Sequence, residues 1–339
     1  MGETAQTLDR PHPAHYVGSG KLQELAAKAE AEQFNVVLFD DELSPSQQRN
    51  LEEALKVKVI DRTALILDIF AQRAQTREAR LQVELAQTEY LLPRLAGQWS
   101  HLERLEGAIG TRGPGETQLE TDRRLVRTRM ARLRREIEDV RRQRDLRRAG
   151  RQRAGIPVVS LVGYTNAGKS TLMRALSGAD VFAEDRLFAT LDPLTRRVAL
   201  PGTGDEPPMP VLMTDTVGFI QKLPTQLVAA FRATLEELQE AHLLLHVLDI
   251  THPDAAEQSA TVEKTLLDLA VADKPRLTAL NKVDRLRRPD GSPVQGTAEI
   301  ADLQDWALRQ SEGAVLVSAL RGWGMDELST ALRDRLTGV

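Results

Sequence analysis

The chain contains the glycine-rich segment Gly163-Tyr164-Thr165-Asn166-Ala167-Gly168-Lys169-Ser170, followed by Thr171. It lies between an apolar run, residues 158–162, and a helical pattern, residues 169–176. The spacing G-x-x-x-x-G-K-S in a strand-to-helix turn is typical of a phosphate-binding loop, because the backbone N–H groups of such a loop surround a phosphate. We therefore expect Lys169 to neutralise the β- and γ-phosphates and the Ser170 hydroxyl to bind Mg²⁺.

Outward from this loop, short apolar strands alternate with helical patterns, which predicts a doubly wound α/β domain with a mostly parallel sheet. The expected strands cover residues 158–162, 211–213, 243–248, 277–280 and 315–317. The expected helices cover residues 169–176, 227–240, 255–270, 298–310 and 325–336.

Further motifs follow three of the predicted strands. Asp215-Thr216-Val217-Gly218 places a carboxylate that can reach Mg²⁺ through water and a glycine N–H at the γ-phosphate. In Asn281-Lys282-Val283-Asp284, the aspartate can accept two hydrogen bonds that guanine offers and adenine lacks, so the nucleotide is expected to be GTP. Val317-Ser318-Ala319 would supply a backbone N–H to the guanine oxygen.

A loop between the first two motifs is expected to respond to the γ-phosphate. It contains Phe188-Ala189-Thr190-Leu191-Asp192, and either Thr190 or Thr195 could bind Mg²⁺ only when that phosphate is present. Phe219 stands where many GTPases have a glutamine that orients water, which predicts slow intrinsic hydrolysis. A partner or an ion would then supply the missing function, and Asn166 is a candidate ligand for K⁺, with an ordinary loop residue as the alternative.

Composition excludes several other classes of site. The 339 residues include no cysteine, which excludes disulfides, thiolate zinc sites and cysteine nucleophiles, and the six histidines never occur as a clustered ligand pair. No apolar run approaches the roughly 18 residues that a membrane helix requires, and the N-terminus has no signal-peptide pattern. We expect a cytoplasmic protein without a membrane span, and a monomer.

The residues before the sheet-forming region divide into two further parts. Residues 1–64 show a strand–helix pattern typical of a small α/β subdomain, and residues 65–153 show two helical patterns separated by a Gly-rich segment at 106–116. We expect a long antiparallel helical hairpin in which Pro93 kinks the first helix. Residues 154–339 would form the nucleotide-binding domain.

The second helix of this hairpin carries most of the positive charge. Between Thr121 and Arg153 there are 14 arginines against five acids, whereas the whole chain has a net charge of −4. Such a segment indicates contact with a polyanion, although it could also be a solvated basic face, and the Gly-rich segment could be only a connector.

Several idiosyncratic stretches together resemble the HflX family of ribosome-associated, Obg-like GTPases. They are Tyr16-Val17-Gly18-Ser19-Gly20-Lys21, residues 41–51, Asp61-Arg62-Thr63, residues 82–87 and above all residues 110–124, which begin Gly110-Thr111-Arg112-Gly113-Pro114-Gly115. The resemblance implies that Thr190 is the switch ligand of Mg²⁺ beside Ser170. It further implies a catalytic role for Lys169, Thr190 and Gly218. Compared with the family pattern, we expect the chain to lack the first N-terminal strand and helix and the small C-terminal domain.

The same resemblance implies that the N-terminal domain and hairpin contact RNA of the large ribosomal subunit, and that family members split or rescue stalled ribosomes. The RNA contacts expected on this basis are Thr111, Arg112, Arg123, Arg124 and Arg127. The leading hypothesis is a GTP-hydrolysing ribosome-binding factor that cycles between GTP and GDP. The alternatives are an RNA-binding module that senses GTP with negligible turnover and, less favoured, a basic helix that binds another nucleic acid or an acidic membrane.

Overall fold

The computed structural model describes residues 2–94, 114–153, 155–178, 191–202, 204, 206–221, 238–288, 290–300 and 313–338, with the backbone alone at 114–119, 145–153, 298 and 300. These residues divide into two compact units. Unit 1 comprises residues 1–72, 81–137 and 224–227, and unit 2 comprises residues 73–80, 138–223 and 228–339. Two long helices belong partly to each unit, so each unit is described by itself.

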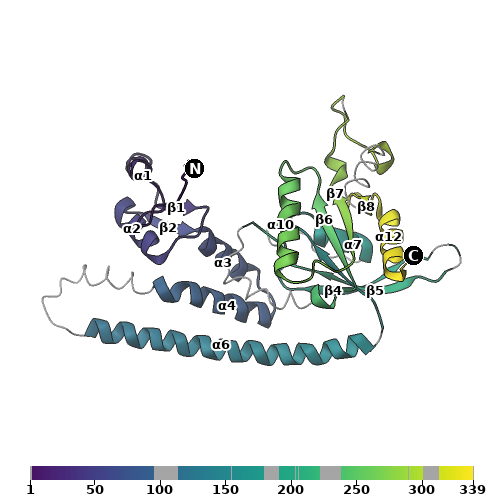
Figure 1. Ribbon diagram of the computed structural model, residues 1–339, viewed down its shortest axis with the longest axis horizontal. Helices are drawn as coiled ribbons and strands as arrows, with labels where there is room; N and C mark the ends of the chain where they lie inside the picture. The colour runs from purple at the N-terminus through teal and green to yellow at the C-terminus, as the bar shows by residue number, and fades with distance from the viewer. Residues whose placement is uncertain are drawn as a thin grey trace. The chain divides into compact units, whose positions relative to one another are not determined.

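Unit 2 is built on a six-stranded sheet (Figure 1). Its strands are β3 (Val158–Val162), β4 (Leu194–Leu200), β5 (Met209–Asp215), β6 (Leu243–Asp249), β7 (Arg276–Asn281) and β8 (Ala314–Leu316), in the order β4-β5-β3-β6-β7-β8. All neighbouring pairs are parallel except β4 with β5. The predicted α/β class with a mostly parallel sheet is therefore confirmed, and β4 is a strand that the sequence analysis missed.

Helices lie on both faces of this sheet. The helices are α7 (Lys169–Ser177), α10 (Ala255–Asp268) and α12 (Met325–Thr337), with short 3-10 turns η2 (Val283–Arg285) and η3 (Thr297–Ile300). Leu172 of α7 and Leu328 of α12 pack with Leu245 on one face, whereas Val262 of α10 packs with Leu244 on the other. Adjacent residues of β6 thus face opposite sides, as the two-residue repeat of a strand requires, and both faces are apolar because both are covered.

Two predicted helices of unit 2 cannot be compared fully. Most of residues 227–240 lies outside the described part of the chain. Of residues 298–310, the structure describes only the start, where 297–300 form the turn η3.

Unit 1 begins with a small α/β arrangement. It contains α1 (Ser19–Glu32), β1 (Val36–Phe39), α2 (Pro45–Leu55), β2 (Lys58–Asp61) and α3 (Arg62–Arg73). The strands β1 and β2 are parallel, as expected for strands joined by a crossover helix. Ser44 caps α2 through its side chain, which accepts from the Gln47 N–H, while the Gln47 side chain accepts from the Ser44 N–H. Pro45 takes the first helical position, where its missing N–H is harmless.

The two helices that follow are α4 (Arg77–Leu91), with the short turn η1 (Leu92–Arg94), and α6 (Pro114–Arg153). They run antiparallel, since Glu78 near the start of α4 pairs with Arg144 and Glu89 near its end pairs with Arg134, both at 2.8 Å. α4 ends at Leu91 and Pro93 lies in η1; residues 95–113 lie outside the described part of the chain, so the kink expected at Pro93 stays a prediction. Proline has no N–H to donate, so a helix often stops there. Most of the Gly-rich segment lies outside the described residues.

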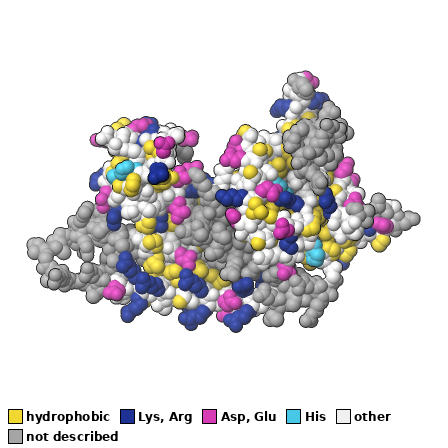
Figure 2. Space-filling view, viewed as in Figure 1, with side chains coloured by type: hydrophobic (Ala, Val, Ile, Leu, Met, Phe, Trp, Pro, Cys, Tyr) yellow, Lys and Arg dark blue, Asp and Glu magenta, His cyan; other side chains and the backbone are white. Residues whose placement is uncertain are grey.

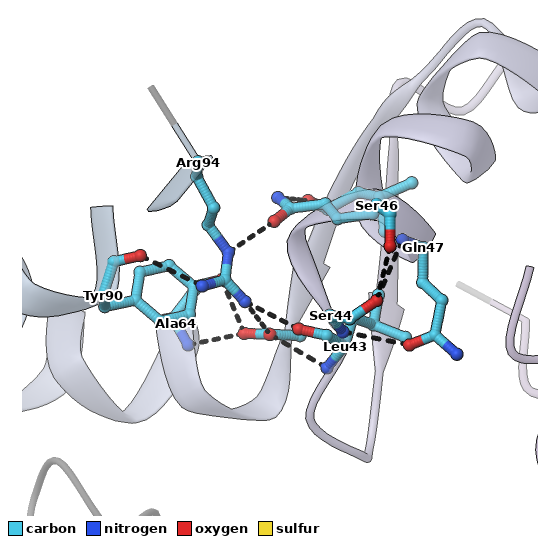
Figure 3. Close-up of polar contacts among 10 residues, drawn as sticks. Leu43, Ser44, Ser46, Gln47, Ala64, Tyr90 and Arg94 are labelled. Atoms are coloured by element: carbon cyan, nitrogen blue, oxygen red, sulfur yellow. Dashed lines mark hydrogen bonds and ion pairs between the residues drawn. The ribbon is translucent and has the colours of Figure 1, made fainter. Parts of the chain in front are cut away.

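A buried polar cluster joins the α/β part of unit 1 to the end of α4 (Figure 3). The Asp61 carboxylate, which is 1% exposed, accepts from the N–H groups of Leu43 and Ala64, at 3.1 and 2.8 Å, and from the Tyr90 hydroxyl at 2.9 Å. The Arg94 guanidinium donates to Asp61 at 3.3 Å and stacks 3.6 Å from the Tyr90 ring centroid. Such a pair is tolerated inside a protein only when further hydrogen bonds satisfy both charges, and here they do.

No helix in the described part of the chain is long and apolar enough to cross a membrane.

Candidate guanine-nucleotide site

The phosphate-binding loop connects β3 to α7, as its sequence predicts. Gly168 immediately precedes α7 with a φ of 98°, and a Cβ at this position would lie 2.3 Å from Asn281 Nδ2, so only glycine fits. Lys169 is 6% exposed, and its Nζ donates to the carbonyl oxygens of Gly163 at 3.2 Å and Tyr164 at 3.0 Å. Burial lowers the pKa of Lys169 to about 8, against an opposing effect of the Asp215 charge. The ammonium group is thus held inside the loop where a phosphate would meet it.

Two oxygen donors meet next to this loop. The Ser170 hydroxyl at the start of α7 donates to Asp215 Oδ2 at the end of β5, over 2.6 Å. A hydroxyl beside a carboxylate is a hard-oxygen set that suits Mg²⁺, which keeps several waters and takes few protein ligands. Thr216 is used differently, because its hydroxyl donates to the Leu161 carbonyl at 2.5 Å and so fixes the motif to β3.

The backbone after Asp215 is fastened to the phosphate-binding loop. The Thr165 N–H donates to the Phe219 carbonyl at 2.8 Å, and the Phe219 N–H donates to the Gly163 carbonyl at 3.0 Å. Gly218 lies so close that an added Cβ would meet Thr165 Cα at 2.6 Å. The Phe219 side chain is 3% exposed and packs in the core with Val162. It therefore points into the core, away from any position from which it could orient water.

The guanine motif is assembled by contacts between motifs far apart in sequence. Asn281 donates from Nδ2 to the Ala167 carbonyl at 2.8 Å and accepts at Oδ1 from the Ala319 N–H at 3.0 Å. The Ser318 hydroxyl donates to Asp284 Oδ1 at 2.5 Å, and the backbone of Val283 is held by Val317. These contacts bring the loops after β3, β7 and β8 together at the carboxyl ends of parallel strands, where nucleotides bind in this class of sheet.

Lys282 of this motif has a partner that the sequence analysis did not identify. Its Nζ lies 2.8 Å from Asp249 Oδ2, at the end of β6, and both side chains are largely buried. The other oxygen of Asp249 accepts from the N–H and hydroxyl of Thr251, at 3.0 and 2.7 Å. Burial opposes ionisation of Asp249, but the hydrogen bonds from Lys282 and Thr251 outweigh it and lower the pKa of its carboxyl. An acid at the end of a strand beside the guanine motif is the signal that could have found it.

The predicted switch loop is only partly described. Phe188, Ala189 and Thr190 lie outside the described residues, so the expected role of Thr190 stays a prediction. Thr195 lies in β4, where its hydroxyl is 3.0 Å from that of Thr214 on β5. Leu191 is buried, and the Asp192 carboxylate binds backbone N–H groups of Gln75 and Thr76. Asp192, which was expected at the nucleotide, is engaged by another part of unit 2, and the sequence offered no signal for this contact.

The predicted RNA-contact residues fall into two groups. Thr111 and Arg112 lie outside the described residues, whereas Arg123, Arg124 and Arg127 lie on α6. Farther along the helix, arginines such as Arg129 and Arg134 form ion pairs with Glu84 and Glu89 of α4. The described side chains include no ion-pair partner for Arg123, Arg124 or Arg127. Figure 2 shows basic side chains gathered along α6.

Three family models match the chain in succession. They are the N-terminal region of GTP-binding GTPases at residues 1–71, the middle region of the same GTPases at residues 73–151, and a 50S ribosome-binding GTPase domain at residues 158–282.

Curated relatives extend over most of the chain. GTPase HflX of Escherichia coli is 48% identical over 97% of this chain and 73% of its own length, and that of Flavobacterium psychrophilum is 49% identical over 89% and 72%. GTPase HflX of Caldanaerobacter subterraneus is 55% identical over 84% of this chain, which spans 66% of that relative's length. A solved GTP-binding protein of Sulfolobus solfataricus in complex with GDP has the same fold, with a TM-score of 0.50 at 23% identity, over 98% of this chain and 89% of that one. With the phosphate, magnesium and guanine motifs brought together as described, the chain belongs to the HflX family of GTPases.

Proposed function

We propose that this chain is a GTP-hydrolysing factor that binds the large ribosomal subunit in its GTP-bound state and is released after hydrolysis. The observation that carries the proposal is the combination of an assembled guanine-nucleotide site with a helix on which Arg123, Arg124 and Arg127 have no ion-pair partner among the described side chains. The match of residues 158–282 to a 50S ribosome-binding GTPase domain supports the same partner. By resemblance to its family, the chain would act in splitting or rescuing stalled ribosomes.

Each part of the nucleotide has residues suited to it. Lys169 and the loop backbone would bind the β- and γ-phosphates, Asp284 the guanine edge, and a backbone N–H of the segment 317–319 the guanine oxygen. Ser170 and Asp215 would hold Mg²⁺, and Thr190 would join them when the γ-phosphate is present. When bound, Mg²⁺ neutralises charge that develops on the phosphates.

The burial of Phe219 bears on how hydrolysis is promoted. Phe219 occupies the position at which many GTPases have a glutamine that orients water, and its side chain is buried in the core. We propose that K⁺ bound beside Asn166, an exposed loop residue with a φ of 61°, promotes hydrolysis in place of the missing glutamine by adding positive charge at the phosphates. GTP turnover should then be several-fold faster in KCl than in NaCl, and Asn166→Ala should abolish the difference.

The RNA contact would be electrostatic. Arg123, Arg124 and Arg127 lie within about 6 Å of helix rise, at 1.5 Å a residue, and can reach adjacent phosphates. Neutralising three phosphates would give a slope of about −2 to −3 in a plot of log affinity against log salt. The triple variant to glutamine should bind the large subunit more weakly and with a shallower salt slope. Arg142→Gln is the matched control, because Arg142 already pairs with Asp139 at 2.6 Å.

The decisive experiment is GTP turnover at fixed Mg²⁺ and K⁺, with and without purified large subunits, with ATP as control. Strong stimulation that is specific for GTP supports a ribosome-activated GTPase. Co-sedimentation with subunits in the presence of a non-hydrolysable GTP analogue tests the gating. If Lys169→Ala binds subunits as well as the parent under these conditions, binding does not depend on the nucleotide and the gating is wrong.

A further inference from the structure

The Asp192 carboxylate, at the end of the predicted switch loop (residues 188–192, called the switch segment below), binds residues that immediately precede α4, more than a hundred positions earlier in the chain. Asp192 Oδ2 accepts from the backbone N–H groups of Gln75 and Thr76, each at 3.0 Å, and Oδ1 accepts from the Thr76 hydroxyl. All three residues belong to unit 2. Two N–H groups and a hydroxyl that converge on one carboxylate form a cradle for a single negative charge.

The cradle lies at the start of α4. Thr76 immediately precedes the helix, and its hydroxyl oxygen accepts from the Ala79 N–H at 3.1 Å, so it caps α4 while it binds Asp192. A negative charge at the N-terminus of a helix is also favoured by the helix dipole. In the same turn, Glu78 pairs with Arg144 of α6 at 2.8 Å, with both side chains mostly buried. The start of α4 is therefore fixed to α6 as well as to the switch segment.

Asp192 is only two residues from Thr190 and directly follows buried Leu191. Two residues farther on, β4 begins at Leu194 and pairs with β5. The hydrogen bonds of Asp192 thus fix residues 191–192, which lie between Thr190 and β4. A chain of two residues spans at most about 7 Å, so the anchor restricts where Thr190 can go.

We propose that Asp192 is a positioning residue for GTP hydrolysis, which anchors the switch segment on the N-terminus of α4 so that Thr190 can reach the magnesium ion. This inference rests on the proposed role of Thr190. It adds a link between the nucleotide and α4, a helix that begins in unit 2 and continues into unit 1. Because coupling between two sites is reciprocal, a partner that orders α4 would also order the switch segment and promote hydrolysis.

Two variants separate the link from the capping of α4. Asp192→Ala removes the carboxylate and leaves the Thr76 cap. Thr76→Asp keeps a good N-cap residue but places a second carboxylate against Asp192. We expect each variant to lower the single-turnover rate of GTP hydrolysis about tenfold, since the ordered switch would lose several charge-assisted hydrogen bonds, while the affinity for GDP stays within about twofold. Thr76→Ser, which keeps both the hydroxyl and the cap, should behave like the parent.

Hydrogen exchange of the Gln75 and Thr76 amides gives a readout that helix stability alone would not change. In the parent, a non-hydrolysable GTP analogue with Mg²⁺ should slow their exchange several-fold relative to GDP, and in Asp192→Ala the two states should exchange alike. Hydrolysis within about twofold of the parent in both variants would overturn the inference. The same holds if the Gln75 and Thr76 amides of the parent exchange at the same rate with the GTP analogue as with GDP. Thr190→Ala distinguishes failure of the anchor from failure of the proposed magnesium ligand. If Thr190→Ala lowers the hydrolysis rate and Asp192→Ala does not, only the anchoring role of Asp192 is wrong. If Thr190→Ala has no effect, the proposed role of Thr190 is wrong.

Discussion

Replacing Phe219 by glutamine tests whether a side chain at this position can reach the bound nucleotide or is confined to the core. By position, the change would restore the water-orienting residue of many GTPases and should accelerate hydrolysis. The structure instead predicts that the change lowers stability and does not accelerate hydrolysis. The side chain at this position is 3% exposed, lies in the core beside Val162 and Leu244, and its backbone is fixed to the phosphate-binding loop on both sides.

The expected cost follows from what the core would lose. Burial of a phenylalanine contributes about 1.5–3 kcal/mol, and a buried amide without partners costs about 1–3 kcal/mol more. A total of about 2.5–6 kcal/mol in a unit of this size would lower Tm by roughly 10 °C. Phe219→Leu keeps the apolar contact and should lose only about 1 kcal/mol.

The assay pairs thermal unfolding with GTP turnover under single-turnover conditions. We expect Phe219→Gln to unfold roughly 10 °C earlier than the parent and to hydrolyse GTP no faster, with Phe219→Leu near the parent in both measurements. A glutamine variant that hydrolyses GTP about tenfold faster and keeps its Tm would contradict the core position of this side chain, because the side chain would then reach the phosphates.

Three other changes have expected outcomes. Arg94→Met leaves the buried Asp61 charge unpaired and should lower the free energy of unfolding by about 3–5 kcal/mol, measured by urea denaturation. Burial lowers the pKa of His246 to about 4 from the ordinary 6.5, so its contribution to stability is complete above pH 6.5 and falls as the pH drops toward 4, with about 2 kcal/mol lost at pH 5. Asp249→Asn removes the charge that holds Lys282 and should weaken GDP binding about tenfold, measured by fluorescence titration, with the hydrolysis rate of bound GTP nearly unchanged.

Each of these has a control on the same chain. Arg132→Met breaks an exposed pair with Glu136 and should cost less than about 0.5 kcal/mol; a similar small loss for Arg94→Met would contradict the role given to the buried pair. His246→Leu should remove the pH-dependent part of the stability loss, and an unchanged pH profile would assign it to another group. Equal GDP affinity of Asp249→Asn and the parent would show that Lys282 needs no partner.

The sequence predicted the larger part of the sheet domain. β3 has the predicted bounds, and β5, β6, β7 and β8 overlap the predicted strands, because strands covered on both faces read as continuous apolar runs. β4 was not predicted because Leu194–Leu200 mixes polar and apolar residues, as an edge strand does when it pairs on one side only. Pro93 lies in the turn η1 directly after α4, and the expected course of the first hairpin helix beyond residue 94 falls outside the described residues.

The candidate site divides in the same way. The phosphate, magnesium and guanine motifs could be predicted from the sequence, because their chemistry requires fixed residue types at fixed spacing within short segments. The partners of these motifs became visible only in the folded protein: Asp249 pairs with Lys282, the Phe219 side chain packs in the core, and backbone N–H groups just before α4 bind Asp192. These contacts join residues 33 to 117 positions apart, and no local pattern encodes which distant backbone N–H or charge will meet a given side chain once the sheet has formed.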